Sequence, residues 1–136
     1  MEDNFNKTKF SLSGKFWIKT DGLSLLGRGK IELLEKIRDT GTLTKAASEL
    51  EIPYRQAWNM VKSMNRDYCC PMVVLRHGGM DHGNAKVTGL GEKLIFEFRR
   101  IELDMKKFFE EQTAKMEFSG DSDGAPLVPE ENCQRS

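Results

Sequence analysis

The fold is decided by residues 42–66, Thr-Leu-Thr-Lys-Ala-Ala-Ser-Glu-Leu-Glu-Ile-Pro-Tyr-Arg-Gln-Ala-Trp-Asn-Met-Val-Lys-Ser-Met-Asn-Arg. Apolar residues recur at helical spacing on both sides of Glu51-Ile52, and Pro53 suits the first position of a new helix. Thr42 or Thr44 can cap the helix before the turn. We therefore predict two short helices joined by a tight turn. This is the helix-turn-helix arrangement, which places its second helix in the major groove of DNA.

The residues before this stretch predict a short strand and a further helix. Residues 15–19 are rich in β-favouring side chains and precede a turn signal at Asp21-Gly22. The helix is expected after Gly27-Arg28-Gly29 and ends at Gly41. Its apolar residues fall on one face and are Ile31, Leu33, Leu34 and Ile37.

A hairpin and a long helix are expected after the second motif helix. Residues 72–76 and 85–88 have strand character, and the Gly-rich residues 77–84 connect them. Residues 90–116 are expected to form one long helix. The predicted fold class is mainly α with a small β-hairpin wing, a winged helix-turn-helix with a long C-terminal dimerisation helix.

The same patterns divide the chain into four parts. We expect a flexible N-terminus (1–14), a winged helix-turn-helix DNA-binding domain (15–89), a long helix that mediates dimerisation (90–116) and a disordered acidic tail (117–136).

Charge is uneven along the chain although its total is zero. Lys and Arg number 21, as do Asp and Glu. Residues 28–100 carry 13 basic and 9 acidic side chains, whereas residues 101–136 carry 4 and 9. This favours an anionic partner for the middle of the chain, but only weakly. The N-terminus is acidic and no apolar run approaches about 18 residues, so we expect no signal peptide or membrane span and a soluble, cytoplasmic protein.

The second motif helix carries the candidates for reading DNA sequence. Arg pairs with guanine and Asn with adenine in the major groove, and the N-terminal residues of such a helix usually reach the bases. Tyr54, Arg55 and Asn59 are therefore the first candidates for base contacts. The alternative is an ordinary solvated helix face. The full set of candidates on this helix is Tyr54, Arg55, Gln56, Asn59, Lys62 and Ser63.

Two further groups are candidates for phosphate contacts. Thr44 and Lys45 open the first motif helix, and a helix N-terminus attracts anions. A simple N-cap is an equally good explanation, and the two roles can coexist. Arg76 and Lys86 flank the Gly-rich loop and would contact the DNA backbone as a wing. The alternative there is a flexible surface hairpin without contacts.

The long helix has an apolar seam. Its residues are spaced 4, 3, 4 and 3 apart, the heptad pattern of helices that pack on a partner. We expect this seam to form a symmetric homodimer, which would place two reading helices about one DNA turn apart. The alternative is packing against the first helix and N-terminal strand of the same chain. The seam residues are Leu94, Phe98, Ile101, Met105 and Phe108.

No other chemistry stands out in the sequence. Cys69, Cys70, His77 and His82 have poor spacing for a metal, and three cysteines make no disulfide framework. No nucleotide-binding or nucleophile motif is present, so we expect no catalytic residue, no cofactor and no enzyme. Two other hypotheses remain: a winged-helix protein–protein adaptor without sequence-specific DNA binding, and a weaker one, a thiol or metal sensor through Cys69 and Cys70.

Three segments carry a family resemblance: residues 41–47 (Gly-Thr-Leu-Thr-Lys-Ala-Ala), residues 52–58 (Ile-Pro-Tyr-Arg-Gln-Ala-Trp) and Met64-Asn65. Here the chain resembles the N-terminal domain of ModE-type molybdate-responsive regulators, which are related to LysR-type DNA-binding domains. The resemblance extends over roughly residues 15–112, through the Gly-rich wing and Gly91-Glu92-Lys93-Leu94-Ile95.

This resemblance implies a dimer that binds double-stranded operator DNA. It places Tyr54, Arg55, Asn59 and Lys62 in the reading helix and Arg76 and Lys86 in the wing. Full-length members of the family carry a β-rich oxyanion-binding domain after the long helix, where this chain has its acidic tail. We therefore expect a stand-alone regulator that does not sense molybdate by that route and that relies on another effector or partner protein, if on any.

Overall fold

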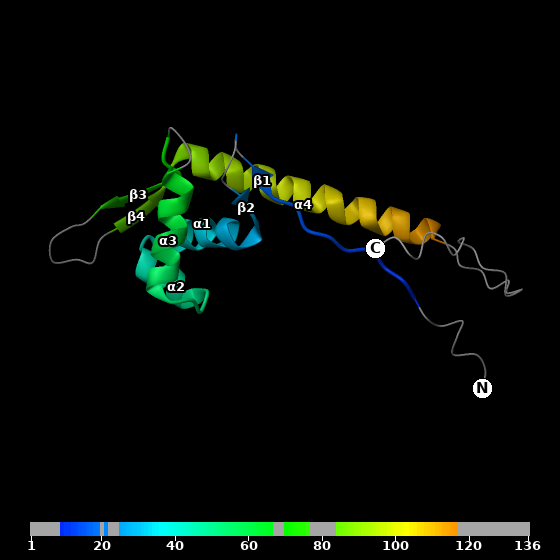
Figure 1. The fold of residues 1–136 in the computed structure, drawn as a ribbon, viewed down its shortest axis with the longest axis horizontal. Coiled ribbons are helices and arrows are strands. Elements are labelled where there is room, and N and C mark those ends of the chain that lie inside the picture. The colour runs from blue at the N-terminus through cyan, green and yellow to red at the C-terminus, as the bar shows by residue number, and fades with distance from the viewer. Residues whose placement is uncertain (1–8, 20, 22–24, 67–69, 77–83, 117–136) are drawn as a thin grey trace, which may run out of the picture. The chain divides into compact units, whose positions relative to one another are not determined.

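The structure is a computed structural model, and it describes residues 9–19, 21, 25–66, 70–76 and 84–116. The chain divides into two units, one of residues Gly14–Met105 and the other of Met1–Ser13 with Lys106–Ser136. Figure 1 shows the elements in chain order. The expected flexible N-terminus lies mostly outside the described residues and the expected acidic tail wholly so; of the expected wing loop, Asn84 is described and begins a strand.

The larger unit is mainly helical, as predicted, with two small antiparallel sheets among its described residues. Its elements are β1 (Ile18–Lys19), β2 (Leu25–Leu26), α1 (Arg28–Thr40), α2 (Leu43–Glu49), α3 (Tyr54–Arg66), β3 (Val73–Arg76), β4 (Asn84–Val87) and the first turns of α4 (Gly89–Lys115). The predicted helices therefore lie within a residue or two of their expected places. The strand β2 was not predicted, because two residues are too few to show a period.

Local sequence marks the end of α1 and the start of α2. Gly41 follows α1 with φ at 81°, a left-handed conformation that glycine adopts at little cost, and its N–H donates to the Ile37 carbonyl at 2.8 Å. Thr42, rather than Thr44, caps α2: its side-chain oxygen accepts a hydrogen bond from the Lys45 N–H at 3.1 Å. Two residues, Gly41 and Thr42, thus connect α1 to α2.

The turn between α2 and α3 is tight, as predicted from Glu51-Ile52. Glu51 has a φ of 57°, and it is the one non-glycine residue with positive φ in the described part of the chain. The Ile52 N–H donates to the Ala47 carbonyl at 3.0 Å. The Pro53 carbonyl accepts the first helical bonds of α3, from Gln56 and Ala57, so α3 begins one residue later than expected.

The hairpin of β3 and β4 is antiparallel, and its register pairs Val74 with Lys86 and Arg76 with Asn84. It packs on the helices through Val73, Ala85 and Val87, which are buried. The Ala85 N–H also donates to the Gly41 carbonyl at 2.9 Å, which ties β4 to the end of α1. Figure 1 shows β3 and β4 side by side, leading away from the helices.

One apolar core joins all the elements of the larger unit. Small side chains at Ala46, Ala47 and Ala57 allow α2 and α3 to pack closely. Gly91 is needed where α4 begins, because a Cβ there would lie 2.5 Å from Val87 Cγ1 and 2.7 Å from the Met72 carbonyl oxygen. The largest fully buried side chains are Phe98, Leu26, Ile31, Leu33, Leu34, Ile37, Met64, Met72, Val61 and Val73.

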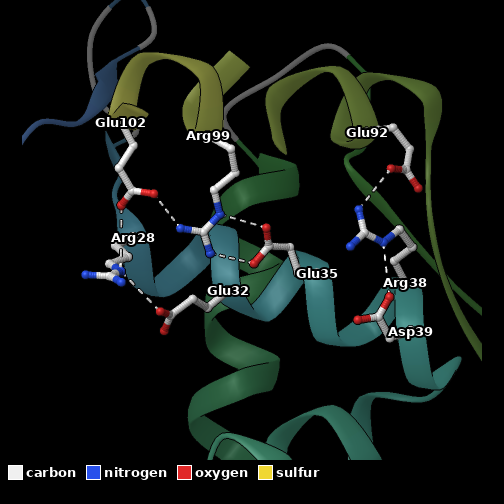
Figure 2. Close-up of polar contacts among 8 residues, drawn as sticks. All are labelled: Arg28, Glu32, Glu35, Arg38, Asp39, Glu92, Arg99 and Glu102. Atoms are coloured by element: carbon white, nitrogen blue, oxygen red, sulfur yellow. Dashed lines mark hydrogen bonds and ion pairs between the residues drawn. The ribbon is translucent and has the colours of Figure 1, made fainter. Parts of the chain in front are cut away.

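Ion pairs join α1 to α4 beside this core (Figure 2). The Arg99 guanidinium donates two hydrogen bonds to the Glu35 carboxylate, at 2.8 and 2.6 Å, and a third to Glu102 at 2.7 Å. Arg28 lies 3.2 Å from Glu32 and 3.8 Å from Glu102. We call these five residues the ion-pair cluster. The hydrogen bond from Arg99 is the main reason that the pKa of Glu35 is lowered.

The smaller unit contains the last turns of α4, from Lys106. There the Leu12 N–H donates to the Thr113 hydroxyl at 3.2 Å, so the segment before Ser13 lies against the helix end. Phe108 and Phe109 have ring centroids 5.9 Å apart, and Phe108 is exposed. None of the described helices combines the length and the apolar character needed to cross a membrane.

Candidate nucleic-acid interface

The outer face of α3 presents most of the predicted candidates to solvent. Five of the six side chains are exposed, namely Tyr54, Arg55, Gln56, Asn59 and Lys62. The opposite face, with Ala57, Val61 and Met64, is buried in the core, so α3 is held firmly while its outer face stays free.

Two of these candidates have partners within the chain. Ser63 is half-buried, and its hydroxyl oxygen accepts a hydrogen bond from Lys30 Nζ at 3.2 Å. It therefore lies at the edge of the exposed face. Lys62 Nζ lies 4.5 Å from the centroid of the Trp58 ring, a cation–π contact. Trp58 itself is half-buried.

The two predicted wing residues share one face of the hairpin. Successive side chains of a strand point to opposite sides, so burial of Val73, Ala85 and Val87 turns their neighbours outward. Arg76 and Lys86 are exposed on this outer face, one on each strand. Asn84 is exposed there too, opposite Arg76.

The start of α2 offers one cation. Thr44 and Lys45 are both exposed. The Lys45 N–H is used by the Thr42 cap, so the ammonium group of Lys45 is the part of this residue that remains for a phosphate. The structure thus shows the cap in place and leaves the phosphate contact as a prediction.

Asn65 is a site residue that the sequence analysis quoted only as part of a motif. Its side-chain N–H donates to the Val73 carbonyl at 2.8 Å, and its side-chain oxygen accepts from the N–H groups of Met72 and Val73 at 2.9 and 3.2 Å. Asn65 thereby ties α3 to the first residues of the hairpin. One signal was present: a polar residue lies four positions after the buried Val61, where the helix faces inward and a polar group needs partners.

The exposed cations of α3 and the hairpin have no neutralising carboxylates on their own elements. These elements contain five Arg or Lys residues and no Asp or Glu. Within the part of the chain that the structure describes, Arg55, Arg76 and Lys86 form no ion pair. We call the exposed set Tyr54, Arg55, Gln56, Asn59, Lys62, Arg76, Asn84 and Lys86 the α3–hairpin surface.

The arginines of α1 and α4 are in the opposite situation. Arg28 and Arg99 belong to the ion-pair cluster, and Arg38 lies 3.2 Å from Asp39 and 3.6 Å from Glu92 (Figure 2). Arg100 pairs with Glu97 at 2.5 Å. Among the described residues, the α3–hairpin surface therefore offers a polyanion cations without ion pairs, whereas the arginines of the α1–α4 side are neutralised.

The residues of the predicted seam on α4 differ in how deeply they are buried. Phe98 is 2% exposed, and its ring stacks on Phe16 with centroids 4.4 Å apart. At this position the alternative of packing within the same chain is the one that the structure shows. Leu94, Ile101 and Met105 are half-buried, and Phe108 is 54% exposed. These four residues remain as the predicted dimer contact.

The hypothesis of a thiol or metal sensor finds little support among the described residues. Of the residues considered for them, Cys69, His77 and His82 lie outside the described residues, and Cys70 is exposed. Among the residues with described positions, no three His, Cys, Asp or Glu side chains gather where they could hold a metal ion.

Known proteins with similar sequences carry three kinds of name. The molybdenum-pterin-binding protein MopB of Rhodobacter capsulatus is 37% identical over 82 residues, which is 60% of this chain and 30% of that protein. The molybdenum transport protein ModE of Azotobacter vinelandii is 30% identical over 87 residues, 64% of this chain and 32% of that protein. The transcriptional regulator ModE of Yersinia pestis is 35% identical over 66 residues, 48% of this chain and 25% of that protein.

This chain is thus related to ModE proteins, as the three motif segments suggested, and also to Mop proteins. It spans about a third or less of the length of each of these relatives. No family model matches the chain.

Proposed function

We propose that the protein is a DNA-binding transcriptional regulator that inserts α3 into the major groove of duplex DNA and lays the hairpin on the backbone beside it. The observation that carries this proposal is the α3–hairpin surface, where Arg55, Arg76 and Lys86 are exposed and unpaired in the described part of the chain. The element order supports it: two helices joined by a tight turn and followed by a hairpin correspond to a winged helix-turn-helix.

The chemistry of the surface divides into base contacts and phosphate contacts. Arg55 and Gln56 lie in the first turn of α3 and Asn59 one turn later, the part of such a helix that reaches base edges. Arg55 suits the O6 and N7 atoms of guanine, and Gln56 and Asn59 suit adenine. The remaining candidates, Tyr54, Lys62, Ser63, Thr44, Lys45, Arg76 and Lys86, would contact bases at the edge of the site or phosphates.

The relatives support the same conclusion at the level of the family. Some are named as transcriptional regulators, and the aligned part of each covers about half or more of this chain. Others are named for binding molybdenum-pterin, and their alignments also span about 60% of this chain. The names therefore favour gene regulation in a molybdenum context, and the free cations favour DNA as the partner of this part.

A homodimer is part of the proposal. Ile101, Met105 and Phe108 continue at heptad spacing along α4 and keep exposed apolar surface. Two copies joined along this seam would present two α3 helices to half-sites about 34 Å apart, one turn of DNA. The operator would then have two-fold symmetry.

A pair of charge-matched variants tests the proposal. Arg55→Ala and Arg100→Ala each remove one exposed arginine, but Arg100 is already neutralised by Glu97. We expect Arg55→Ala to weaken binding to a selected operator by about 1–3 kcal/mol. Arg100→Ala should leave affinity within about 0.5 kcal/mol of wild type.

The operator for this test comes from sequencing the fragmented genomic DNA that the purified protein retains at moderate salt. A two-fold-symmetric motif with half-sites one turn apart is the expected result. Affinity that does not change with salt would contradict the proposal, because each phosphate contact should add about 0.9 to the log–log slope. Equal losses for Arg55→Ala and Arg100→Ala would also contradict it.

A protein–protein adaptor is the competing candidate, and one observation favours it. Phe96 and Leu103 lie seven residues apart on α4 and are 65% and 57% exposed, on a face other than the seam. The genomic selection separates the two candidates: an adaptor enriches no sequence, and its Arg55→Ala variant behaves as wild type toward DNA.

A further inference from the structure

Asn65 is the point at which the helix that would enter the groove meets the strand that would lie on the backbone. Within the part of the chain that the structure describes, the hydrogen bonds of its side chain go to the main chain of two consecutive residues, Met72 and Val73. It is half-buried and lies one turn beyond Lys62 on α3. A single carboxamide thus attaches the start of β3 to α3 by both its donor and its acceptor.

The residues just before β3 are also hydrogen-bonded by Thr88, the residue that precedes α4. The Thr88 N–H donates to the Met72 carbonyl at 2.9 Å, and the Thr88 hydroxyl donates to the Pro71 carbonyl at 2.8 Å. Met72 therefore has its N–H held from α3 and its carbonyl held from the residue before α4. Asn65 is the member of this arrangement that comes from the proposed reading helix.

Because β3 and β4 are paired in a fixed register, the position of Val73 determines the positions of the two wing cations. Arg76 is three residues farther along β3, and Lys86 lies opposite Val74, the next residue. A strand advances about 3.3 Å per residue, so a shift of Val73 relative to α3 moves both cations relative to Arg55. The attachments of Ala85 to Gly41 and of Thr88 to Met72 do not involve α3, so the hairpin stays folded without Asn65 but loses the hydrogen bonds that tie it to that helix.

We infer that Asn65 is a positioning residue that sets the spacing between the base-reading face of α3 and the backbone-contacting face of the hairpin. The inference rests on the proposed function, because it assumes that both faces bind one DNA duplex. Asn65 touches no nucleotide in this scheme: it acts through Arg76 and Lys86. Replacing it should weaken the contribution of the hairpin and leave base recognition by α3 intact.

A double-mutant cycle tests this role with the full chain and its selected operator. Asn65→Ala is measured alone, in an Arg76→Ala/Lys86→Ala background and in an Arg55→Ala background. We expect Asn65→Ala to weaken binding about fivefold alone and with Arg55→Ala, but less than about twofold when the two wing cations are already absent. Thr40→Ala, which also removes a half-buried side-chain hydrogen bond, serves as the control and should not change affinity.

DNA footprinting gives a measurement that a change in protein stability alone would not alter. With Asn65→Ala, hydroxyl-radical protection of the sugars under the hairpin should weaken, while protection of guanine N7 in the major groove should persist. Circular dichroism confirms that each variant is folded at the temperature of the assay. If Asn65→Ala does not fold, Asn65→Ser replaces it in the same cycle, since its hydroxyl can keep one of the bonds.

The outcomes separate this inference from the proposed function. Wild-type protein that binds no DNA overturns both. Wild-type binding with no effect of Asn65→Ala, or with an equal loss in the background lacking the wing cations, overturns the positioning role alone. Loss of guanine protection together with sugar protection also overturns it, because Asn65 would then act on α3 itself.

Discussion

Arg55 on α3 and Arg99 on α4 are the same side chain in two opposite settings. Arg99 donates to two carboxylates at 2.6–2.8 Å, and these hydrogen bonds raise its pKa further above its already high ordinary value. Arg55 is exposed and makes no ion pair with the residues whose positions are described. One arginine is used to assemble the unit, and the other is left for a partner.

The difference extends over both surfaces. α4 carries as many acidic as basic side chains, whereas the charged residues of α3 and of the strands β3 and β4 are all basic. The formal net charge of zero is the sum of these unlike regions. Total charge is therefore a poor guide to a partner, because binding of a polyanion depends on the local field of one face.

The largest effect should come from the α1–α4 side, where packing adds to the ion pairs. Phe98→Ala removes a buried ring that stacks on Phe16 and should lower the free energy of unfolding by about 3–5 kcal/mol. Phe96→Ala removes an exposed ring from the same helix and should cost less than about 0.5 kcal/mol. Urea unfolding measures both, and a large cost at Phe96 would show that a partner copy covers it in solution.

The ion-pair cluster should make the α1–α4 side sensitive to acid. Glu35→Gln weakens the charged hydrogen bonds from Arg99 and should cost about 2 kcal/mol at pH 7. The Arg99 hydrogen bond lowers the folded pKa of Glu35 below its ordinary 4.5, so its contribution is full above about pH 4.5 and is lost as the pH falls through the folded value.

The stability difference between wild type and Glu35→Gln should therefore shrink below pH 4.5. Urea unfolding from pH 7 to pH 3 checks this. Glu97→Gln is the control: it breaks an exposed pair with Arg100 and should change stability by less than about 0.5 kcal/mol. A gap for Glu35→Gln that stays constant with pH would contradict the role given to its carboxylate.

A smaller effect should separate the two surfaces by their salt dependence. Lys86→Ala removes from the hairpin a cation that has no ion pair among the described residues. It should weaken DNA binding by about 1 kcal/mol for all sequences, with a log–log salt slope shallower by about 0.9 per copy. Lys93→Ala removes an exposed cation from α4 and should leave the slope unchanged. Equal changes for the two lysines would mean that the DNA responds to total charge and not to the α3–hairpin surface.

The smallest effect concerns the turn that leads into α3. Glu51 has a φ of 57°, a conformation that costs a non-glycine residue energy, so Glu51→Gly should stabilise the fold by about 0.5–1 kcal/mol. Glu51→Ala removes the same carboxylate without relieving the backbone and should not stabilise it. Both variants should bind DNA equally, and slightly more tightly than wild type. Unequal affinities would show that the turn conformation, rather than its charge, matters for binding.

Local patterns in the sequence determined the helices and the exposed face of α3. Pro53, Gly41 and Thr42 mark helix ends through their own backbone preferences, and the spacing of Ala57, Val61 and Met64 shows which face is buried. These signals lie within a few residues of one another, so no distant contact is needed to interpret them. The exposure of Tyr54, Arg55, Gln56, Asn59 and Lys62 follows from them directly.

Contacts between distant residues were decided by the tertiary structure alone. The heptad seam placed Phe98 among its neighbours, but Phe16, 82 residues earlier, buries it within the chain. The pairing of Arg99 with Glu35, the attachment of Asn65 to β3 and the contact of Gly91 with Met72 all join separate elements. A periodic pattern shows that a face will be covered, but the residues that cover it depend on how the elements pack. The packing of the elements also decides which arginines are neutralised by a carboxylate and which are not.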